Sequence, residues 1–198
     1  FSDMLEGFRR LSECPVLLGE ILDVLYYNYD RIDFVDSPVD LGFECPLDLH
    51  CTYSRDQILA ALDFMKPGTV REGTKYLLDK KTDVHFVTLN KAEKDYSPTT
   101  MYEDYSINEV LFHWQSQSTT SQSSTTGQRY MNHRSMGVRE LLFVREFKSG
   151  KLGAALYTFL GLADFLSVNG SKPMNITWRL HEPIPAKYLR KTNKLVVG

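Results

Sequence analysis

The chain of 198 residues has few cysteines and no long apolar segment. Cys14, Cys45 and Cys51 are an odd number and fit no disulfide framework, which favours a reducing compartment. No apolar run reaches the roughly eighteen residues of a membrane-spanning helix, and the first residues lack the basic and apolar segments of a signal peptide. We therefore expect a soluble cytoplasmic protein that has no membrane partner.

Sequence motifs of enzymes are also missing. No Walker-type glycine loop, G-x-S-x-G elbow or H-E-x-x-H helix occurs, and the five histidines form no close motif. The segment CPLDLHC places Cys45 near His50 and Cys51, but its spacing matches no paired C-x-x-C knuckle and no fourth ligand is evident. Buried structural cysteines are the favoured interpretation. We expect no catalytic residue, no metal and no cofactor in this chain.

The net charge of −2 conceals an asymmetry along the chain. Residues 1–63 carry 13 acidic against 4 basic residues, whereas residues 64–198 carry 12 acidic against 19 basic residues. Such a division is a hint of a part that binds a polyanion joined to a part with another task. Two solvated surfaces of different charge would give the same pattern, so charge alone leaves both interpretations open.

Residues 1–66 predict a helical subdomain. Apolar residues recur at helical spacing in LEGFRRL, in VLLGEILDVL and in ILAAL. Ser2 and Ser54 suit helix N-caps, and Pro15 suits the first turn of a helix.

Residues 67–198 change to the pattern of strands. Six short runs rich in β-branched and aromatic residues are separated by Gly, Asn, Ser or Pro: TKYLLDKK, VHFVTLNK, EVLFHWQSQ, ELLFVREF, AALYTFLGLADFLSV and MNITWRLHEPI. Runs of this kind without helices between them favour an antiparallel sheet that curls into a barrel or half-barrel. The fold class is therefore α+β, with a helical part followed by a mostly antiparallel barrel.

One of these runs, VLFHWQSQ, is rich in groups that bind bases. The two-residue period of a strand puts Phe112 and Trp114 on one face and His113, Gln115 and Gln117 on the other. Tryptophan offers a stacking surface for an unstacked base, and glutamine can hydrogen-bond a base edge. Alternatively, Trp114 belongs to the core, as most lone tryptophans do.

The strand is followed by a serine-rich segment and then by a basic one. Residues 116–126 are almost entirely Ser, Thr and Gln, which predicts a loop that is disordered in the free protein. After it, GQRYMNHRSMGVRELLFVRE mixes arginines with Tyr130 and His133, a composition typical of surfaces that contact phosphates and bases.

Several segments together resemble a known domain family: PLDLHCTYSRDQILAAL, DVHFVTLNK, YSPTTMYEDYSINEVLFHWQSQ, TGQRYMNH, ELLFVREF, ALYTFLGLADF and PMNITWRLHEPIP. The family, long labelled a domain of unknown function, is found at the C-terminal end of proteins that carry a phospholipase-D-like nuclease and a superfamily two helicase. Its best understood members resemble type IV modification-dependent restriction enzymes of the SauUSI kind. The resemblance extends from about residue 15 to residue 189.

The resemblance implies a target recognition domain for double-stranded DNA that contains 5-methylcytosine or 5-hydroxymethylcytosine, read by base flipping. It implies a helical coupler leading to a β-barrel similar to SRA and PUA folds. Nuclease and ATPase motifs are absent from this chain, so the parent protein would supply cleavage, with ATP and Mg²⁺. The helicase and nuclease domains of that parent are the implied protein partners.

On this hypothesis Trp114 stacks on the flipped base or lines its pocket, and Gln115 or Gln117 contacts the base edge or fills the vacated space. Further pocket residues are His113, Tyr105 and Tyr130, and phosphate ligands are Arg129, Arg134, Arg139 and Arg145. The sequence leaves open which face of the strand lines the pocket. It also leaves open a protein interaction or dimerisation module, and a hydrolase with an unrecognised site.

Overall fold

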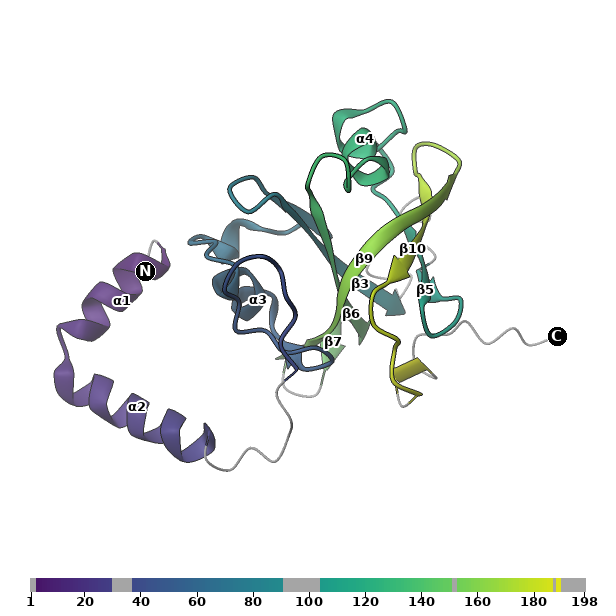
Figure 1. Cartoon of the computed structure of the whole chain (residues 1–198). Coiled ribbons are helices and arrows are strands. Elements are labelled where there is room, and N and C mark those ends of the chain that lie inside the picture. Colours follow the sequence, from purple (N-terminus) through teal and green to yellow (C-terminus); the bar gives the residue numbers. More distant parts are fainter. Residues whose placement is uncertain (1–2, 30–36, 91–103, 151–152, 187, 190–198) are drawn as a thin grey trace.

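The computed structural model describes residues 3–29, 37–90, 104–150, 153–186 and 188–189 (Figure 1). The helices in these residues are α1 (Met4–Ser12), α2 (Pro15–Tyr29), α3 (Arg55–Ala61), the 3-10 helix η1 (Pro67–Thr69) and α4 (Thr125–Met131). The strands are β1 (Thr52–Tyr53), β2 (Thr74–Leu77), β3 (Thr82–Asn90), β4 (Tyr105–Ser106), β5 (Leu111–Gln115), β6 (Arg139–Phe147), β7 (Ser149–Gly150), β8 (Gly153–Ala154), β9 (Tyr157–Asn169) and β10 (Asn175–Leu180).

Eight strands form one curled sheet in the order β2-β3-β6-β9-β10-β5-β4, with β1 paired to β9. All pairs in this sheet are antiparallel except β3 and β6, which run parallel. The mixed α+β class is confirmed, but the predicted barrel closure is wrong. Within the described residues β2 and β4 remain separate edges, and both are short strands that offer few ladder groups for closure.

Both faces of the sheet are buried at β6. On β6, Leu142 and Val144 belong to one core cluster, while Leu141 and Phe143 belong to the other. This explains why the strand reads as the continuous apolar run LLFV and not as an alternating one. The first cluster centres on Trp178 and its neighbours, and the second lies beneath α3.

Helix α3 belongs to the sheet domain. It begins with a capping box in which Ser54 Oγ accepts from the backbone N–H of Gln57, and its fully buried Ile58 and Leu59 join the second core cluster. The neighbouring strand β1 pairs with β9. The structure therefore differs from the predicted boundary at residue 66, because elements before that boundary share the core of the sheet.

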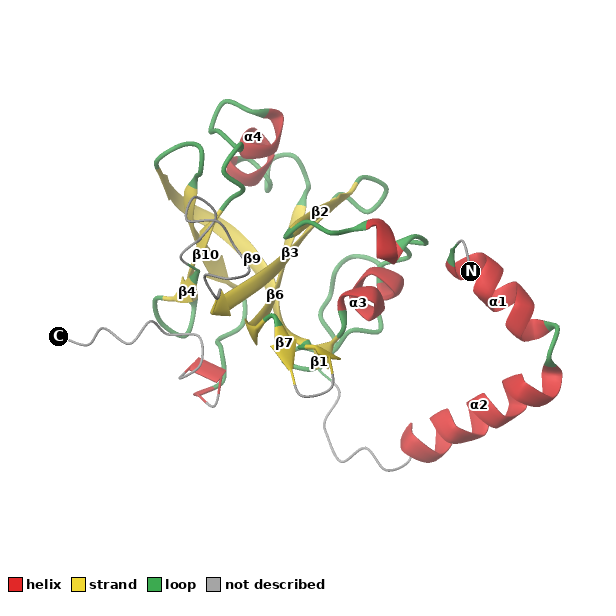
Figure 2. Cartoon of the chain, turned by 180° about the vertical axis from the view of Figure 1, so that it is seen from behind, coloured by secondary structure: helices red, strands yellow, loops and turns green. Residues whose placement is uncertain are grey.

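Helices α1 and α2 extend away from the sheet (Figure 2). Asp3, not Ser2, caps α1, since its Oδ1 accepts from Glu6 N–H at 2.9 Å. Large apolar side chains of both helices are exposed: Leu5, Phe8, Val16, Leu17, Ile21, Leu22, Val24, Leu25, Tyr26 and Tyr27. Even so, no helix in the described part of the chain has the length and apolarity needed to cross a membrane.

The serine-rich loop is ordered, so the prediction of disorder is wrong. Gln122 Nε2 donates to Gly170 O at 2.8 Å, and Lys172 N–H donates to Thr120 O at 3.1 Å, which fastens the loop to the connection between β9 and β10. Ser124 caps α4 by accepting from Gly127 N–H. Polar side chains thus stabilise this loop by satisfying backbone groups, although it buries little apolar surface.

Candidate nucleic-acid interface

A pocket of about 180 Å³ lies where β5, β3 and β6 meet the segment that precedes β4. The residues of its wall that matter for recognition are Trp114, Gln115, Gln117, Asp104, Thr88 and Arg145. Trp114, Asp104 and Arg145 therefore line one cavity, together with Gln115 and Gln117. A cavity of this size can hold a single nucleobase.

Trp114 lines the pocket together with the aromatic residues Phe86 and Tyr157. The alternation predicted for β5 is confirmed, because Phe112 and Trp114 are buried whereas His113 and Gln115 are only half-buried. The indole is 5% exposed and packs edge to face against His85 at 4.6 Å and against Tyr130 at 5.5 Å between ring centroids. Trp114 consequently serves the core and the pocket together.

Trp114→Ala is expected to lower the free energy of unfolding by about 3–5 kcal/mol, because it removes a buried aromatic ring. Trp114→Phe keeps a flat ring and is expected to lose much less. Urea denaturation of the two variants measures the difference. An alanine variant of wild-type stability would show that Trp114 contributes only to the pocket.

Asp104 supplies the carboxyl of the pocket wall. The side chain is buried, and its Oδ1 accepts from the backbone N–H of Gln115 at 2.8 Å. The Gln115 side chain is held in turn by Asn175, whose Oδ1 accepts from Gln115 Nε2 at 2.9 Å. The pocket therefore contains polar groups with fixed positions, as the reading of a base edge requires.

The pocket adjoins a larger basic cleft of about 560 Å³. Arg55, Arg71 and Arg145 line both cavities, and Lys148 lines the cleft alone. Tyr157 organises two of these groups, since its hydroxyl accepts from Arg55 Nη2 at 3.3 Å and the Arg145 guanidinium lies 4.4 Å from its ring centroid. Arg71 and Lys148 are exposed. The cleft thus places several cations next to the pocket, an arrangement suited to phosphates.

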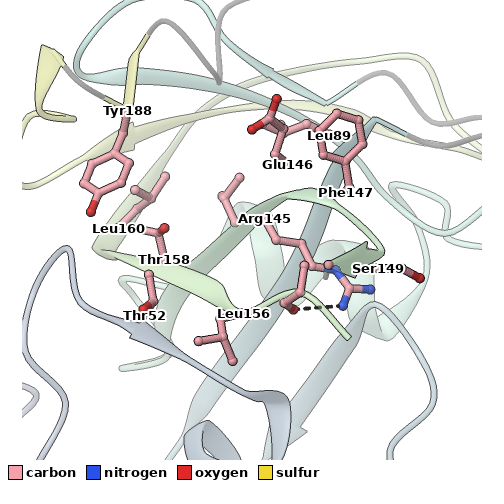
Figure 3. Close-up of a pocket in the computed structure, with 13 residues that line it drawn as sticks. Thr52, Leu89, Arg145, Glu146, Phe147, Ser149, Leu156, Thr158, Leu160 and Tyr188 are labelled. Carbon is pink, nitrogen blue, oxygen red and sulfur yellow. Dashed lines mark hydrogen bonds between the residues drawn. The ribbon is translucent and has the colours of Figure 1, made fainter. Parts of the chain in front are cut away.

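A third cavity, of about 300 Å³, lies beyond Arg145 (Figure 3). Its lining includes the apolar residues Leu89, Val144 and Leu160 as well as Glu146 and Tyr188. Figure 3 also shows the Arg145 guanidinium, whose Nη1 donates to Ala155 O at 3.3 Å. Nε of the same residue donates to Thr88 Oγ1 at 2.9 Å. Arg145 therefore stands at fixed geometry among all three cavities.

Three residues predicted for the base pocket lie elsewhere. Tyr105 and His113 are cross-strand partners on β4 and β5, and their rings stack at 4.7 Å. They lie on the face of β5 opposite to Trp114. Tyr130 is buried in the core cluster, where burial and the carboxyls of Asp83 and Glu140 raise the pKa of its hydroxyl.

All four arginines predicted as phosphate ligands interact with the protein itself, Arg145 through Thr88, Ala155 and Tyr157. Arg129 makes two hydrogen bonds to the carboxylate of Asp83, at 2.5 and 3.0 Å. Arg134 makes two to Asp164, which lower the pKa of that carboxyl to about 2. Arg139 lies over the ring of Phe43 and donates to Lys80 O. Only Arg145 of the four lines the cleft.

Sequence reasoning missed Asp104, Arg55, Arg71, Lys148 and Tyr157. Asp104 had a detectable signal, since YEDYS places carboxyls between two tyrosines a few residues before the amide-rich strand. No sequence signal pointed to the basic residues of the cleft. Arg55, for example, was part of the predicted helical subdomain. Among the described residues no group of His, Cys, Asp and Glu is arranged to hold a metal ion, and Cys14, Cys45 and Cys51 form no disulfide.

A model of a domain family of unknown function, DUF3427, matches residues 47–191. The chain belongs to the DUF3427 family. No curated protein matches the chain. The DUF3427 region starts before β1 and α3 and contains the whole pocket and the basic cleft, whereas α1 and α2 precede it. The candidate interface is therefore a feature of the DUF3427 domain itself.

Proposed function

We propose that this chain is a target recognition domain that binds double-stranded DNA containing 5-methylcytosine or 5-hydroxymethylcytosine by base flipping. The observation that carries the proposal is the base-sized pocket of Trp114, Asp104 and the two glutamines, which opens into a cleft lined by Arg55, Arg71, Arg145 and Lys148. The sequence resemblance to modification-dependent restriction enzymes supports the same reading. A curled sheet with a pocket on one face is also compatible with an SRA-like or PUA-like domain.

The chemistry of each group suits one part of a flipped nucleotide. Extruding a base costs a few kcal/mol, which stacking and edge hydrogen bonds in a closed pocket recover. The Trp114 ring offers the stacking surface, and the Asp104 carboxylate accepts from the exocyclic amine of cytosine, as carboxylates do in direct readout. Arg71 and Lys148 would hold the flanking phosphates.

On this proposal the domain supplies specificity and the parent protein supplies cleavage. An ATP-driven helicase and a Mg²⁺-dependent nuclease of the same polypeptide would be its partners. The apolar faces of α1 and α2 would then couple the domain to the motor.

Binding to a short duplex with and without one 5-methylcytosine, at low and at moderate salt, tests the proposal. A clear preference for the methylated duplex is expected. Equal binding that weakens with salt would contradict base recognition and leave a nonspecific DNA clamp.

The exposed cations of the cleft are expected to set the salt dependence of that binding. Arg71→Ala and Lys148→Ala should each reduce the slope of log K against log salt by about one, with methylated and unmethylated duplexes affected equally. Arg9→Ala is the matched control, since Arg9 is exposed on α1 and pairs with Glu13. If both cleft variants kept the wild-type slope of log K against log salt, the cleft would not bind the phosphates.

A second candidate function is a protein interaction module without base specificity. The observation in its favour is the apolar surface of α2, where Val16 and Leu25 are 79% and 58% exposed. Contiguous apolar surface of this kind marks protein contacts. The same salt titration separates the candidates, because an apolar interface keeps its affinity as salt rises.

A further inference from the structure

A buried polar pair lies next to Trp114, which lines the pocket. His85 Nε2 and Glu140 Oε2 are 2.6 Å apart, and both side chains are fully buried. Because β3 and β6 are parallel with Asp83 opposite Glu140, the side chains of His85 and Glu140 project from the same face of the sheet. The His85 ring meets Trp114 edge to face, with an interplanar angle of 72°. His85 therefore contacts Trp114, while neither His85 nor Glu140 lines the cavity.

Stability of the core does not account for this pair. Buried polar pairs are often no more stable than apolar side chains of the same volume, because desolvation offsets their attraction. Within the described residues, His85 Nδ1, Glu140 Oε1 and the nearby Trp178 Nε1 are buried without a hydrogen-bond partner. Each such atom adds a cost that leucine or methionine would not have.

We propose that the His85–Glu140 pair holds Trp114 in the orientation that recognition of the modified base requires, so that His85 is a positioning residue. This inference rests on the proposed function. The hydrogen bond from Glu140 fixes the plane of the imidazole, and the edge-to-face contact transfers that orientation to the indole. An aliphatic residue at position 85 would fill the space but would leave the rotation of the indole less restricted.

The protonation state of the pair follows from its surroundings. Burial lowers the pKa of His85 to about 3, and the charges of Arg129 and His133 act in the same direction. Burial likewise raises the pKa of Glu140, and the charge of Asp83 adds to this while Arg129 opposes it. Of the groups on α4, Arg129 and Tyr130 face the pair. Glu140 therefore keeps its proton and donates it to the neutral imidazole.

This arrangement predicts the pH dependence of stability. In the unfolded chain the histidine titrates near 6.5 and the glutamate near 4.5. Above pH 6.5 only the folded state holds a proton on the pair, so stability falls as pH rises. Below pH 4.5 the unfolded state holds one proton more, so stability also falls as pH drops. Between these values both states hold one proton, and the pair contributes no slope.

The test compares the wild-type chain with Glu140→Gln and with the double variant His85→Leu/Glu140→Met. The double variant is expected to keep or raise the thermal midpoint and to lose about tenfold of the preference for the methylated duplex, because the edge-to-face contact that orients Trp114 is removed. In Glu140→Gln the amide still donates to His85, so the preference should persist. The loss of stability above pH 6.5 should disappear, because no carboxyl remains to titrate.

Phe159→Leu is the matched control, because Phe159 is fully buried in the other core cluster, away from Trp114. It should lower stability and leave base preference unchanged. A double variant with wild-type preference would overturn the inference, as would a Glu140→Gln variant that loses the preference while remaining folded.

Acrylamide quenching of tryptophan fluorescence tests the positioning role of His85 without a measurement of DNA binding, so it distinguishes failure of this inference from failure of the proposed function. Trp178 is fully buried, so quenching reports mainly on Trp114. If the wild-type chain showed no preference for methylated DNA, the proposed function would fail, yet the double variant should still show stronger quenching. Unchanged quenching would overturn the positioning role by itself.

Discussion

Asp104→Asn is expected to remove the ability of the domain to reject thymine, while its affinity for 5-methylcytosine stays within a few-fold of wild type. Thymine and 5-methylcytosine carry the same methyl group and differ at C4, where thymine has a carbonyl oxygen and cytosine an amine. An ionised carboxylate only accepts hydrogen bonds, whereas an amide both donates and accepts. The carboxylate at position 104 therefore discriminates between two bases that a methyl pocket alone would confuse.

The size of the effect follows from the contact that changes. A specific contact to a base edge contributes about 1–3 kcal/mol of discrimination, which is roughly a 10- to 100-fold difference in affinity. Asparagine keeps the acceptor oxygen that receives the backbone N–H of Gln115, so the wall of the pocket should retain its geometry. The variant consequently tests hydrogen-bond readout with little change in shape.

Competition between two duplexes measures this prediction. One carries 5-methylcytosine opposite guanine, the other carries thymine opposite guanine, and all flanking pairs are identical. Asp79→Asn is the control, since Asp79 is an exposed aspartate in the turn between β2 and β3. If Asp104→Asn rejected thymine as strongly as the wild-type chain does, Asp104 would not contact the base.

Local pattern predicted which side chains of β5 share a face, because that division depends on strand periodicity alone, but it did not predict which face lines the pocket. The two-residue period of VLFHWQSQ assigned Phe112 and Trp114 to one face before any contact was known, and the burial of β5 follows that period. The prediction of a closed barrel was wrong for a different reason. Whether two edge strands pair depends on the whole curvature of the sheet and on the parallel contact of β3 with β6, which no short window contains.

The roles of the arginines could not be predicted, because their partners are distant in sequence. Arg129 is separated by 46 positions from the carboxyl that binds it, and Arg55 reaches the cleft only because α3 packs on the sheet through Ile58 and Leu59. A count of basic residues near an aromatic strand cannot distinguish an arginine that neutralises a buried carboxylate from one that faces solvent. The prediction of disorder for the serine-rich loop was wrong for the same reason, since the loop hydrogen-bonds to the backbone of a hairpin far along the chain.

Arg129→Ala is expected to lower the free energy of unfolding by about 3–5 kcal/mol, because it leaves a buried carboxylate without its partner. The Asp83 side chain is 1% exposed, and burial raises its pKa while the two hydrogen bonds from Arg129 oppose that rise. The guanidinium also lies 4.0 Å from the ring centroid of Tyr76. The residue therefore serves the ion pair and the packing of α4 on β2 and β3.

Two variants and a binding measurement decide between this structural role and the phosphate role that the sequence suggested. Asp83→Leu/Arg129→Met removes both charges and should recover most of the lost stability, since no unpaired charge remains buried. Arg134→Ala should change the denaturation midpoint little, because Arg134 is exposed. At a temperature where Arg129→Ala remains folded, its DNA affinity should keep the wild-type salt slope. A slope reduced by about one would instead assign Arg129 to a phosphate, since each neutralised phosphate contributes about that much.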